Sequence, residues 1–346
     1  MNAFVPEFSV VIPAHNGMPD LVDAVESALA QTHAPMEIVV VDDASTDGSG
    51  DAVEARFGTR VRVVRGRFGS AGAARNAGWR AARGAWVAFL DADDLWFPEK
   101  LTTAAEKLAA APEADWFFSD GAFRTLDGQL HASWFGLYAD LVEPWCGAPI
   151  AQLFEVNFVL TSSAVVRRAA LEATGGFDES LSHAEDLDLW IRLSRRGLAT
   201  ASRRSLVRYQ HREGGLTRQT ENRLKGGATL FERLAADTGL HPDLRRSAKR
   251  RAGLYRYKLA LHALREGRTA EARAGFAASW MFPERVTPVI AGWCAALLPP
   301  SLFAKLRGRK AAVAVATPMV AVRRVELRGD ARKDGAGAPA GAEGAR

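Results

Sequence analysis

Acidic residues gather where an apolar run of the chain ends, in residues 85–94, which read AWVAFLDADD. An uncharged run of this length predicts a strand covered on both faces, and ligands of open α/β sheets bind beyond the carboxyl ends of the strands. Carboxylates as close as Asp91, Asp93 and Asp94 repel one another unless a cation lies between them, and hard oxygen ligands suit Mg²⁺ or Mn²⁺. The sequence therefore predicts a divalent metal that holds a phosphate group.

Two further pairs of acids stand at the ends of predicted elements. Asp42 and Asp43 follow the run EIVVV, so a second strand also ends in carboxylates. Glu185 and Asp186 open a predicted helix, where negative charge favours the helix dipole. Asp186 shares a helical face with Trp190, and a carboxylate on an inward face either caps the helix locally or points into a pocket.

The elements that must position these acids alternate along the first hundred residues. Helices are predicted from Pro19, over 51–57 and over 69–83, and they separate strands predicted at 8–13, 37–41, 61–64 and 85–90. This alternation is typical of an α/β fold with a doubly wound, mostly parallel sheet flanked by helices. The third helix contains small residues that favour close packing on the sheet, namely Ala71, Ala74 and Gly78.

Beyond residue 97 the alternation loosens. A helix over 98–110 precedes an apolar segment at 115–120 and an aromatic stretch, and further helices are predicted over 223–236, 242–266 and 269–280. Residues 286–310 are apolar with a basic end, but three prolines interrupt them, so they fit a hairpin in a bilayer interface better than a spanning helix of about 20 residues. The tail from about residue 329, rich in Ala, Gly and Pro, is predicted to be disordered.

The composition limits the classes of function. The 346 residues are 48% hydrophobic and 25% charged, which is enough for a sizeable core. A formal net charge of +5 is too mild and too scattered to indicate nucleic acid, and a basic surface near anionic lipid or phosphate fits equally well. Cys146 and Cys294 show no metal or disulfide pattern, and residues 1–7 lack the features of a signal peptide. We therefore expect a cytoplasmic protein without a nucleic-acid partner, peripheral on the inner face of the membrane.

Four stretches together resemble the family 2 glycosyltransferases, which have the GT-A fold. In chain order they are SVVIPAHN from residue 9, VDDASTD from residue 41, GAARNAG from residue 72 with LDADD from residue 90, and Glu185-Asp186 followed by Trp190 and Arg192. Each stretch alone is a weak signal, but their order and spacing are specific, and they cover roughly residues 8–217. We expect a GT-A domain over 1–217, a helical extension over 218–310 and a tail over 311–346.

The resemblance implies an inverting, metal-dependent hexosyltransferase that moves a sugar from a nucleoside diphosphate, with UDP expected, to a hydroxyl of a glycan or lipid-linked acceptor. Asp186 would be the general base, and Asp93 would ligate the metal through the diphosphate. Asp91 would hold the ribose or a metal-bound water, and His211 falls where some members place a third metal ligand. Glu185 and Trp190 would lie on the acceptor side. The nucleotide-sugar positions would be Pro13, Ala14, Asn16, Asp42, Asp43, Gly72, Arg75, Asp91 and Ala92.

Other interpretations of these residues stay open in the sequence. Asp42 and Asp43 could cap a turn, residues 91–94 could cap a helix over 95–108, and Trp190 could belong to the core. A sugar-phosphate nucleotidyltransferase would share the sheet and the metal chemistry, although residues 13–17 lack the basic glycine-rich loop that it needs. A non-catalytic nucleotide-sugar binding module would keep the fold without a base. Two departures, His15 for the family's Tyr and Ala44 for its Gly, affect the nucleotide's identity more than the reaction.

Overall fold

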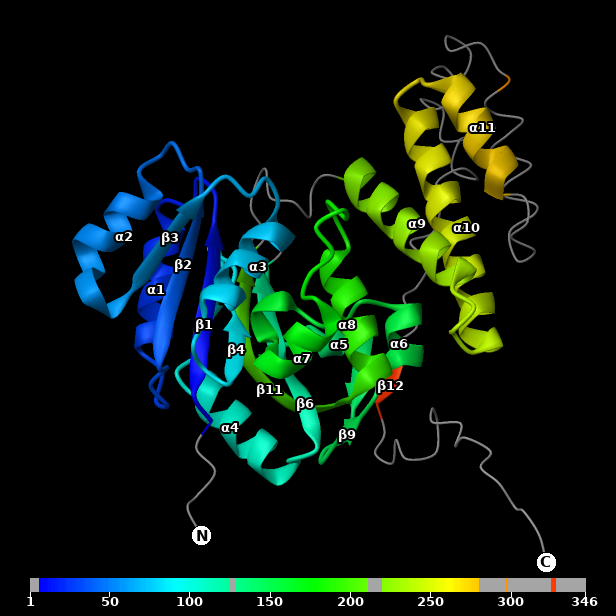
Figure 1. Cartoon of the computed structure of the whole chain (residues 1–346). Helices are drawn as coiled ribbons and strands as arrows, with labels where there is room; N and C mark the ends of the chain where they lie inside the picture. Colours follow the sequence, from blue (N-terminus) through cyan, green and yellow to red (C-terminus); the bar gives the residue numbers. More distant parts are fainter. Residues whose placement is uncertain (1–5, 125–128, 211–219, 280–296, 298–324, 328–346) are drawn as a thin grey trace, which may run out of the picture.

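The structure is a computed structural model, which describes residues 6–124, 129–210, 220–279, 297 and 325–327. A central sheet is flanked by helices on both faces, and a group of helices from the last part of the chain stands beside it (Figure 1). The expected α/β class is confirmed. His211 and almost all of 286–310 lie outside the described residues, as does the tail from 328, so the expectations for them stay predictions.

The first half of the sheet is parallel, as the alternating pattern predicts. Its strands lie in the order β3-β2-β1-β4, with Ala14 of β1 beside Asp42 of β2 and Val11 beside Phe89 of β4. The strands are β1 (Phe8–Ala14), β2 (Glu37–Asp43), β3 (Arg62–Gly66) and β4 (Trp86–Phe89). Because parallel strands end at the same edge, the segments that follow β1, β2 and β4 meet there.

The two faces of this half bury different residues of the same strands. Val10 and Val40 belong to a core with the helix α1 (Asp20–Leu29), whereas Val11 and Val41 belong to a core with α3 (Ala71–Ala81). A Cβ on Gly78 of α3 would lie 2.3 Å from the Val11 side chain, so only glycine lets this helix lie so close to the sheet. This confirms the packing expected from the small residues. The helix α2 (Ser49–Phe57) follows β2, with a short 3₁₀ turn, η1 (Gly58–Arg60), after it.

The second half of the sheet adds short antiparallel strands, while its long strands β6 (Ala114–Arg124) and β11 (Leu198–Gln210) keep the direction of β4, so the sheet is mostly parallel as predicted. The strand β10 (Val165–Arg167) runs antiparallel between β4 and β6. The strand β11 is parallel to β6 and antiparallel to β5 (Leu95–Trp96). The order is therefore set by long-range pairing, which periodicity does not reveal.

Shorter elements connect these strands. The chain passes through α4 (Lys100–Ala110), β7 (Leu130–His131), α5 (Phe135–Tyr138), β8 (Ala139–Leu141), β9 (Cys146–Gly147), α6 (Ile150–Glu155), η2 (Thr161–Ser163), α7 (Arg168–Thr174) and α8 (Glu185–Arg196). The strand β12 (Val325–Leu327) returns from the predicted tail to pair with β8, and Leu327 is buried there. This strand lies within the predicted tail of 311–346, before residue 329, from which disorder is predicted.

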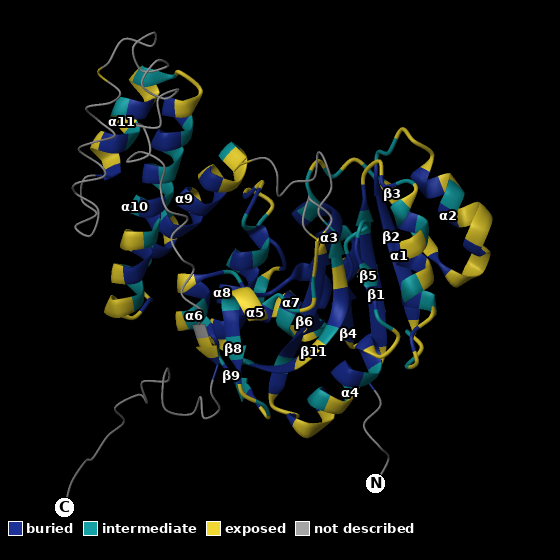
Figure 2. Cartoon of the chain, turned by 180° about the vertical axis from the view of Figure 1, so that it is seen from behind, coloured by how far each residue is buried: buried dark blue, intermediate teal, exposed yellow. Residues whose placement is uncertain are grey.

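Residues 220–279, the continuously described part of the extension, form three helices within a few residues of their predicted bounds. They are α9 (Thr220–Ala236), α10 (Pro242–Arg265) and α11 (Thr269–Ser279). Phe231 of α9 belongs to the main core, whereas Tyr257 of α10 and Phe276 of α11 share a small separate core. Figure 2 shows this pattern, with buried residues along the sheet and exposed residues on the outer helix faces. Among the described helices, none is long and apolar enough to span a bilayer.

Lys100 is a charged residue inside the core at the start of α4. Its side chain is fully buried, and within the described part of the chain its Nζ has no hydrogen-bond partner. The ammonium lies 4.6 Å from the ring centroid of Phe117 and 5.6 Å from that of Trp96. Burial lowers the pKa of Lys100 to about 7, because an apolar environment disfavours the charged form.

Lys100→Met is predicted to stabilise the protein, and the gain should shrink as pH rises. Between the folded pKa of about 7 and an unfolded pKa of about 10.4, the unfolded chain binds more protons, so wild-type stability increases with pH. The gain in unfolding free energy should therefore be largest near pH 7, up to about 4 kcal/mol, and small near pH 10. Urea denaturation of both proteins across this range measures it, and parallel pH curves would contradict the assignment.

Candidate functional site

The loops after β1 and β2 are joined at the carboxyl edge of the parallel strands. Asn16 accepts a hydrogen bond from the Thr46 amide at 2.8 Å, and its own amide donates to Ser45 Oγ at 3.0 Å. A Cβ on Gly17 would lie 3.5 Å from that of Ala92, so the loop after β4 also meets them. Ala14, Asn16 and Ala92 therefore lie near one another at this edge, and Pro13 belongs to the last part of β1.

Asp42 and Asp43 use their carboxylates to shape these loops. Asp43 accepts hydrogen bonds from the amides of Phe68 at 2.5 Å and Gly69 at 2.9 Å. Asp42 accepts one from the Ser45 amide at 3.0 Å, which forms the turn-capping contact that the sequence left open. Both acids lie at the edge of the site, where their carboxylate oxygens accept hydrogen bonds from backbone amides of the adjoining loops.

Left-handed backbone marks the same region. Asn16 and Ala44 both have φ of 52°, a conformation that alanine adopts only with strain. This explains physically why glycine suits position 44 in proteins with this motif. His15 adds a further contact, because its Nδ1 lies 2.6 Å from the carbonyl oxygen of Asp43 and donates to it.

A buried arginine connects the two carboxylate clusters. Arg75 of α3 donates to Asp91 Oδ1 at 2.7 Å and to Glu185 Oε1 at 2.9 Å, and its guanidinium lies 5.4 Å from the ring centroid of Phe177. Only 6% of its side chain is exposed, so the two carboxylates replace its water. Despite that burial, the charges of Asp91 and Glu185 raise the pKa of Arg75 and keep it a cation.

Glu185 is held in the interior rather than on an acceptor surface, which corrects its predicted place. Its carboxylate faces Arg75, and a Cβ on Gly72 would lie 3.2 Å from its Cγ, so Gly72 makes room for it. Burial raises the pKa of Glu185 to about 7, although the positive charge of Arg75 opposes the shift. Glu185 thus anchors the start of α8 through a buried ion pair.

Trp190 is likewise a core residue, so its predicted acceptor-side role is wrong. Its side chain is fully buried, and its ring stacks on Trp116 with centroids 5.6 Å apart and planes at 6°. Phe177 packs edge-on against the same ring at 6.4 Å. The helical periodicity that placed Trp190 beside Asp186 did not distinguish a core face from a binding face.

The three acids after β4 have different environments. Asp94 is buried and accepts hydrogen bonds from Ser162 Oγ at 2.5 Å and from the Gln210 amide at 3.1 Å, which ties the end of β11 to this loop. Burial and the charges of Asp93 and Asp91 raise the pKa of Asp94 well above its usual range. The alternative in which residues 91–94 cap a helix is wrong, because α4 begins only at Lys100.

Asp93 carries a charge that its surroundings leave poorly balanced. Burial, followed by the negative charge of Asp91, raises the pKa of Asp93 to about 6. Such a carboxylate pair suits a divalent cation, because an ion between the two oxygens would remove the repulsion. Within the described residues, no three His, Cys, Asp or Glu side chains converge to hold an ion. Asp91 and Asp93 would supply two carboxylates to such a site and do not complete one by themselves.

Asp186 is half-buried and directly follows Glu185, the ion-pair partner of Arg75. Its Oδ2 accepts a hydrogen bond from Asn157 at 2.9 Å, which fixes the orientation of the carboxylate. Burial raises the pKa of Asp186. The positive charge of Arg75 opposes this shift, and the negative charge of Asp91 adds to it. A carboxylate whose pKa is raised and whose orientation is fixed can accept a proton.

Sequence reasoning missed several residues that build this site. Asn157 orients Asp186, and the Phe177 ring lies against Arg75. Ser162 Oγ accepts a hydrogen bond from the Asp91 amide at 3.0 Å and donates one to Asp94. Asn157 and Ser162 lie outside the four stretches that carry the family resemblance. No local pattern marks them, because their roles depend on contacts with distant segments.

Known proteins resemble this chain in sequence and in fold. Residues 9–172 match the family model described as Glycosyl transferase family 2. The succinoglycan biosynthesis protein ExoO of Rhizobium meliloti is 44% identical over 108 residues, which is 31% of this chain and 31% of that protein. The chain thus matches about a third of the length of this curated relative.

Two solved structures share the fold. The crystal structure of S. aureus TarS 1-349 in complex with UDP-GlcNAc superposes with a TM-score of 0.60 at 19% identity, covering 88% of each chain. The mannosyltransferase PcManGT of Pyrobaculum calidifontis, in complex with GDP-Man and Mn²⁺, has a TM-score of 0.55 at 21% identity and covers 90% of this chain and 86% of its own. These likenesses establish the GT-A-like fold expected from the sequence.

Arg75→Met is predicted to destabilise the protein by about 3–5 kcal/mol, because it leaves the carboxylates of Asp91 and Glu185 without their buried cation. Arg80→Met on the same helix is the matched control, since Arg80 is 53% exposed and pairs with Glu179 on the surface. That change should alter stability by less than about 1 kcal/mol.

Chemical denaturation of each variant measures these differences. Adding Glu185→Gln to Arg75→Met should restore part of the lost stability, because one uncompensated charge disappears. Equal losses for Arg75→Met and Arg80→Met would show that Arg75 is not the buried junction of the two clusters.

Proposed function

Residues 9–172 form a domain of glycosyl transferase family 2, and we propose that the chain is an inverting glycosyltransferase. It moves a sugar from a nucleoside diphosphate to a hydroxyl of a glycan or lipid-linked acceptor. One observation carries the proposal: Arg75 joins Asp91, after β4, to Glu185, the neighbour of Asp186. A single buried cation thus fixes an acid of the leaving-group side relative to the candidate base.

The nucleotide binds at the carboxyl edge of β1, β2 and β4. The loops that carry Pro13, Ala14 and Asn16 meet Ala92 there, and Asp42 and Asp43 hold the adjoining backbone in place. Gly72 and Arg75 close the site from α3. We choose a UDP-sugar as donor, and the fold neighbours with bound UDP-GlcNAc and GDP-Man support a nucleotide sugar of this general kind.

Asp93 and Asp91 would hold a divalent Mg²⁺ or Mn²⁺ ion against the diphosphate. When bound, such an ion neutralises the charge that develops on a leaving diphosphate. The unbalanced pair of carboxylates supports this assignment, since burial and Asp91 together raise the pKa of Asp93. His211 stays the predicted third ligand, outside the described residues.

Asp186 acts as the general base. An inverting displacement needs its base on the face of the sugar opposite the leaving group, and Asp186 belongs to α8 rather than to the loop after β4. Asn157 orients its carboxylate, and burial raises the pKa of Asp186 so that it can take the proton of the acceptor hydroxyl. Arg75 keeps Asp91 and α8 at a fixed separation during this step.

The acceptor belongs to an envelope glycan or its lipid-linked precursor. The resemblance of 108 residues to a protein named for succinoglycan biosynthesis supports polysaccharide synthesis. We place the protein at the cytoplasmic face of the membrane, where residues 286–310 would lie in the interface. Their apolar composition with a basic end supports this placement.

Nucleotide binding and proton transfer should separate in two variants. UDP or UDP-GlcNAc with Mn²⁺ is expected to raise the melting temperature of the wild type, because a ligand of the folded state stabilises it by mass action. Asp186→Asn should keep this shift but lose at least about 100-fold in the rate of UDP-GlcNAc hydrolysis, in which water takes the place of the acceptor hydroxyl, GlcNAc is the product and UDP is released. Asp93→Ala should lose the Mn²⁺-dependent part of the shift.

Thermal-shift assays with UDP, GDP and their sugars, with and without Mn²⁺, test these expectations together with steady-state UDP release. A fully active Asp186→Asn protein would sink the proposed mechanism, and the absence of any nucleotide-dependent shift in the wild type would sink the proposed function.

Deletion of residues 287–310 is predicted to release the protein from anionic liposomes, because these residues carry the proposed interface segment. Co-sedimentation with vesicles that contain phosphatidylglycerol measures the effect. If the shortened protein still sediments with the vesicles to the same extent, this segment does not bind lipid.

A further inference from the structure

We propose that the helical extension positions the catalytic base, because α9 holds the loop that leads into Glu185 and Asp186. This loop, residues 175–184, is called the base loop here, and Gly226 and Arg233 of α9 are the positioning residues. The inference rests on the proposed function, in which Asp186 is the base. It gives the extension a role in the reaction that neither the family motifs nor their spacing include.

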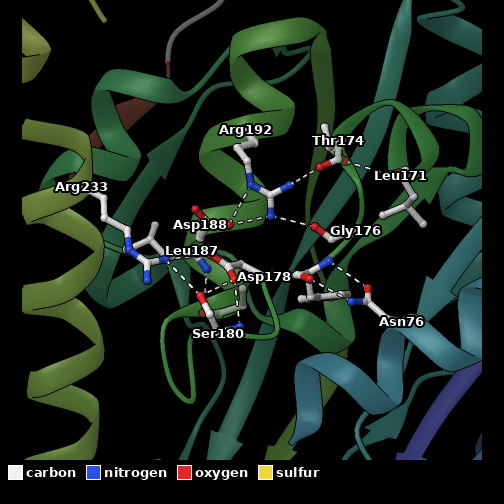
Figure 3. A network of polar contacts seen from close by, with 12 residues as sticks. Asn76, Leu171, Thr174, Gly176, Asp178, Ser180, Leu187, Asp188, Arg192 and Arg233 are labelled. Atoms are coloured by element: carbon white, nitrogen blue, oxygen red, sulfur yellow. Dashed lines mark hydrogen bonds and ion pairs between the residues drawn. The ribbon is translucent and has the colours of Figure 1, made fainter. Parts of the chain in front are cut away.

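Residues of the main domain hold one side of the base loop. Asn76 of α3 donates to the Phe177 carbonyl at 2.8 Å and accepts from the Phe177 amide at 2.9 Å. Arg192 of α8 donates to the carbonyls of Thr174 and Gly176, each at 2.7 Å. Figure 3 shows Asn76 and Arg192 directed at this first part of the loop.

The end of the base loop is strained just before the base. Ala184 has φ of 68°, and it is the residue that directly precedes α8. A residue other than glycine costs about 1–2 kcal/mol in this conformation, so contacts from elsewhere must hold it. Arg192 and Asn76 act on residues 174–177, and Asn76 also donates to Glu179 Oε1 at 2.8 Å, so the residues after Glu179 are left to other contacts.

Arg233 supplies one of these contacts from α9. Its Nη1 donates to Asp178 Oδ2 at 2.9 Å and to Ser180 Oγ at 3.2 Å, on the side of the loop away from Asn76 (Figure 3). Asp178 in turn accepts from the Ser180 amide at 2.9 Å. Although burial opposes it, hydrogen bonding from Ser180 and the charge of Arg233 lower the pKa of Asp178, so the pair stays ionised.

Gly226 supplies a second contact, directly on the loop backbone. A Cβ at this position would lie 2.4 Å from the carbonyl oxygen of His183 and 2.9 Å from its carbonyl carbon. Only a residue without a side chain therefore lets α9 lie against the chain three positions before Asp186. Leu230 and Phe231 pack α9 into the main core, so the helix that presses on the loop is itself well anchored.

These contacts connect α9 of the extension to Asp186 through the base loop. A displacement of α9 would move His183 and Asp178, and through Ala184 it would change how α8 presents Asp186. A small shift of a catalytic group lowers the rate without removing the substrate, because orientation matters more to the transition state than to binding. The nucleotide lies against other elements, so its affinity should not depend on α9.

Adjacent glycines and neighbouring ion pairs of α9 give matched controls for the test. Gly226→Ala places a methyl group against the His183 carbonyl, whereas Gly227→Ala places one 2.5 Å from the Tyr255 ring of α10. Arg233→Ala removes the contact with the base loop, whereas Arg256→Ala removes an ion pair with Glu232 that lies within the extension, at 2.6 Å. Each control changes the same type of residue without touching the loop.

Two measurements on the full chain decide the proposal. Gly226→Ala and Arg233→Ala are expected to lower kcat for UDP-GlcNAc hydrolysis about tenfold with KM and the UDP-induced thermal shift unchanged. Amide hydrogen exchange in residues 176–187 should rise about threefold or more in the same variants. Gly227→Ala and Arg256→Ala should leave kcat and the exchange of residues 176–187 within about twofold of the wild type. Arg233→Lys should recover part of the kcat that Arg233→Ala loses.

Equal losses of kcat in the controls, or unchanged exchange of residues 176–187 in Gly226→Ala and Arg233→Ala, would overturn the proposal. Failure of the positioning by α9 can be distinguished from failure of the proposed function, because hydrogen exchange needs no substrate. A wild-type protein without nucleotide-dependent shift or UDP release disproves the proposed function, and the positioning of the base with it. The exchange comparison then reports only whether α9 orders the loop.

Discussion

A guanidinium that has lost its water must be neutralised, and this constraint on Arg75 organises the site. Removing a cation from water is costly unless paired carboxylates and hydrogen bonds compensate. Arg75 finds these partners in Asp91 and Glu185, which stand on segments far apart in the sequence. The packing of α3 on the sheet, made close by Gly78, sets the depth at which Arg75 lies. The fold therefore fixes the distance between two functional halves through one buried charge.

The acids of the site are chemically alike, but they differ in burial and in their hydrogen-bond partners, and their roles differ accordingly. Asp94 is buried and holds β11 through Ser162 and Gln210, so it serves the fold. Asp91 neutralises Arg75, while Asp93 has no comparable partner among the described residues and is the acid that suits a cation. Glu185 anchors α8 from inside, whereas its neighbour Asp186 is half-buried and is oriented by Asn157. Burial and partners, rather than residue type, separate structural from catalytic carboxylates.

The extension is joined to this site more closely than a separate helical domain would be. Its first helix contributes Phe231 to the main core and lies on the backbone of the base loop, whereas α10 and α11 bury a core of their own. The last described strand, β12, also returns to pair with β8 of the domain. The boundary predicted near residue 217 thus separates segments of different composition, while the contacts across it are part of the same site.

Local patterns in the sequence were sufficient for the elements, because helix and strand periodicity reflects which faces are buried. They predicted the parallel strands, the three helices of the extension and the acids at strand ends, and the order of the motifs indicated the family. Periodicity could not predict the short antiparallel strands in the second half of the sheet, nor that Trp190 stacks on Trp116 in the core and that Glu185 points inward. Nor could it find Asn157, Ser162 or the contact between Gly226 and His183. These depend on which distant segments meet, and only the tertiary structure decides that, because the partners of a buried polar group are chosen by proximity in space.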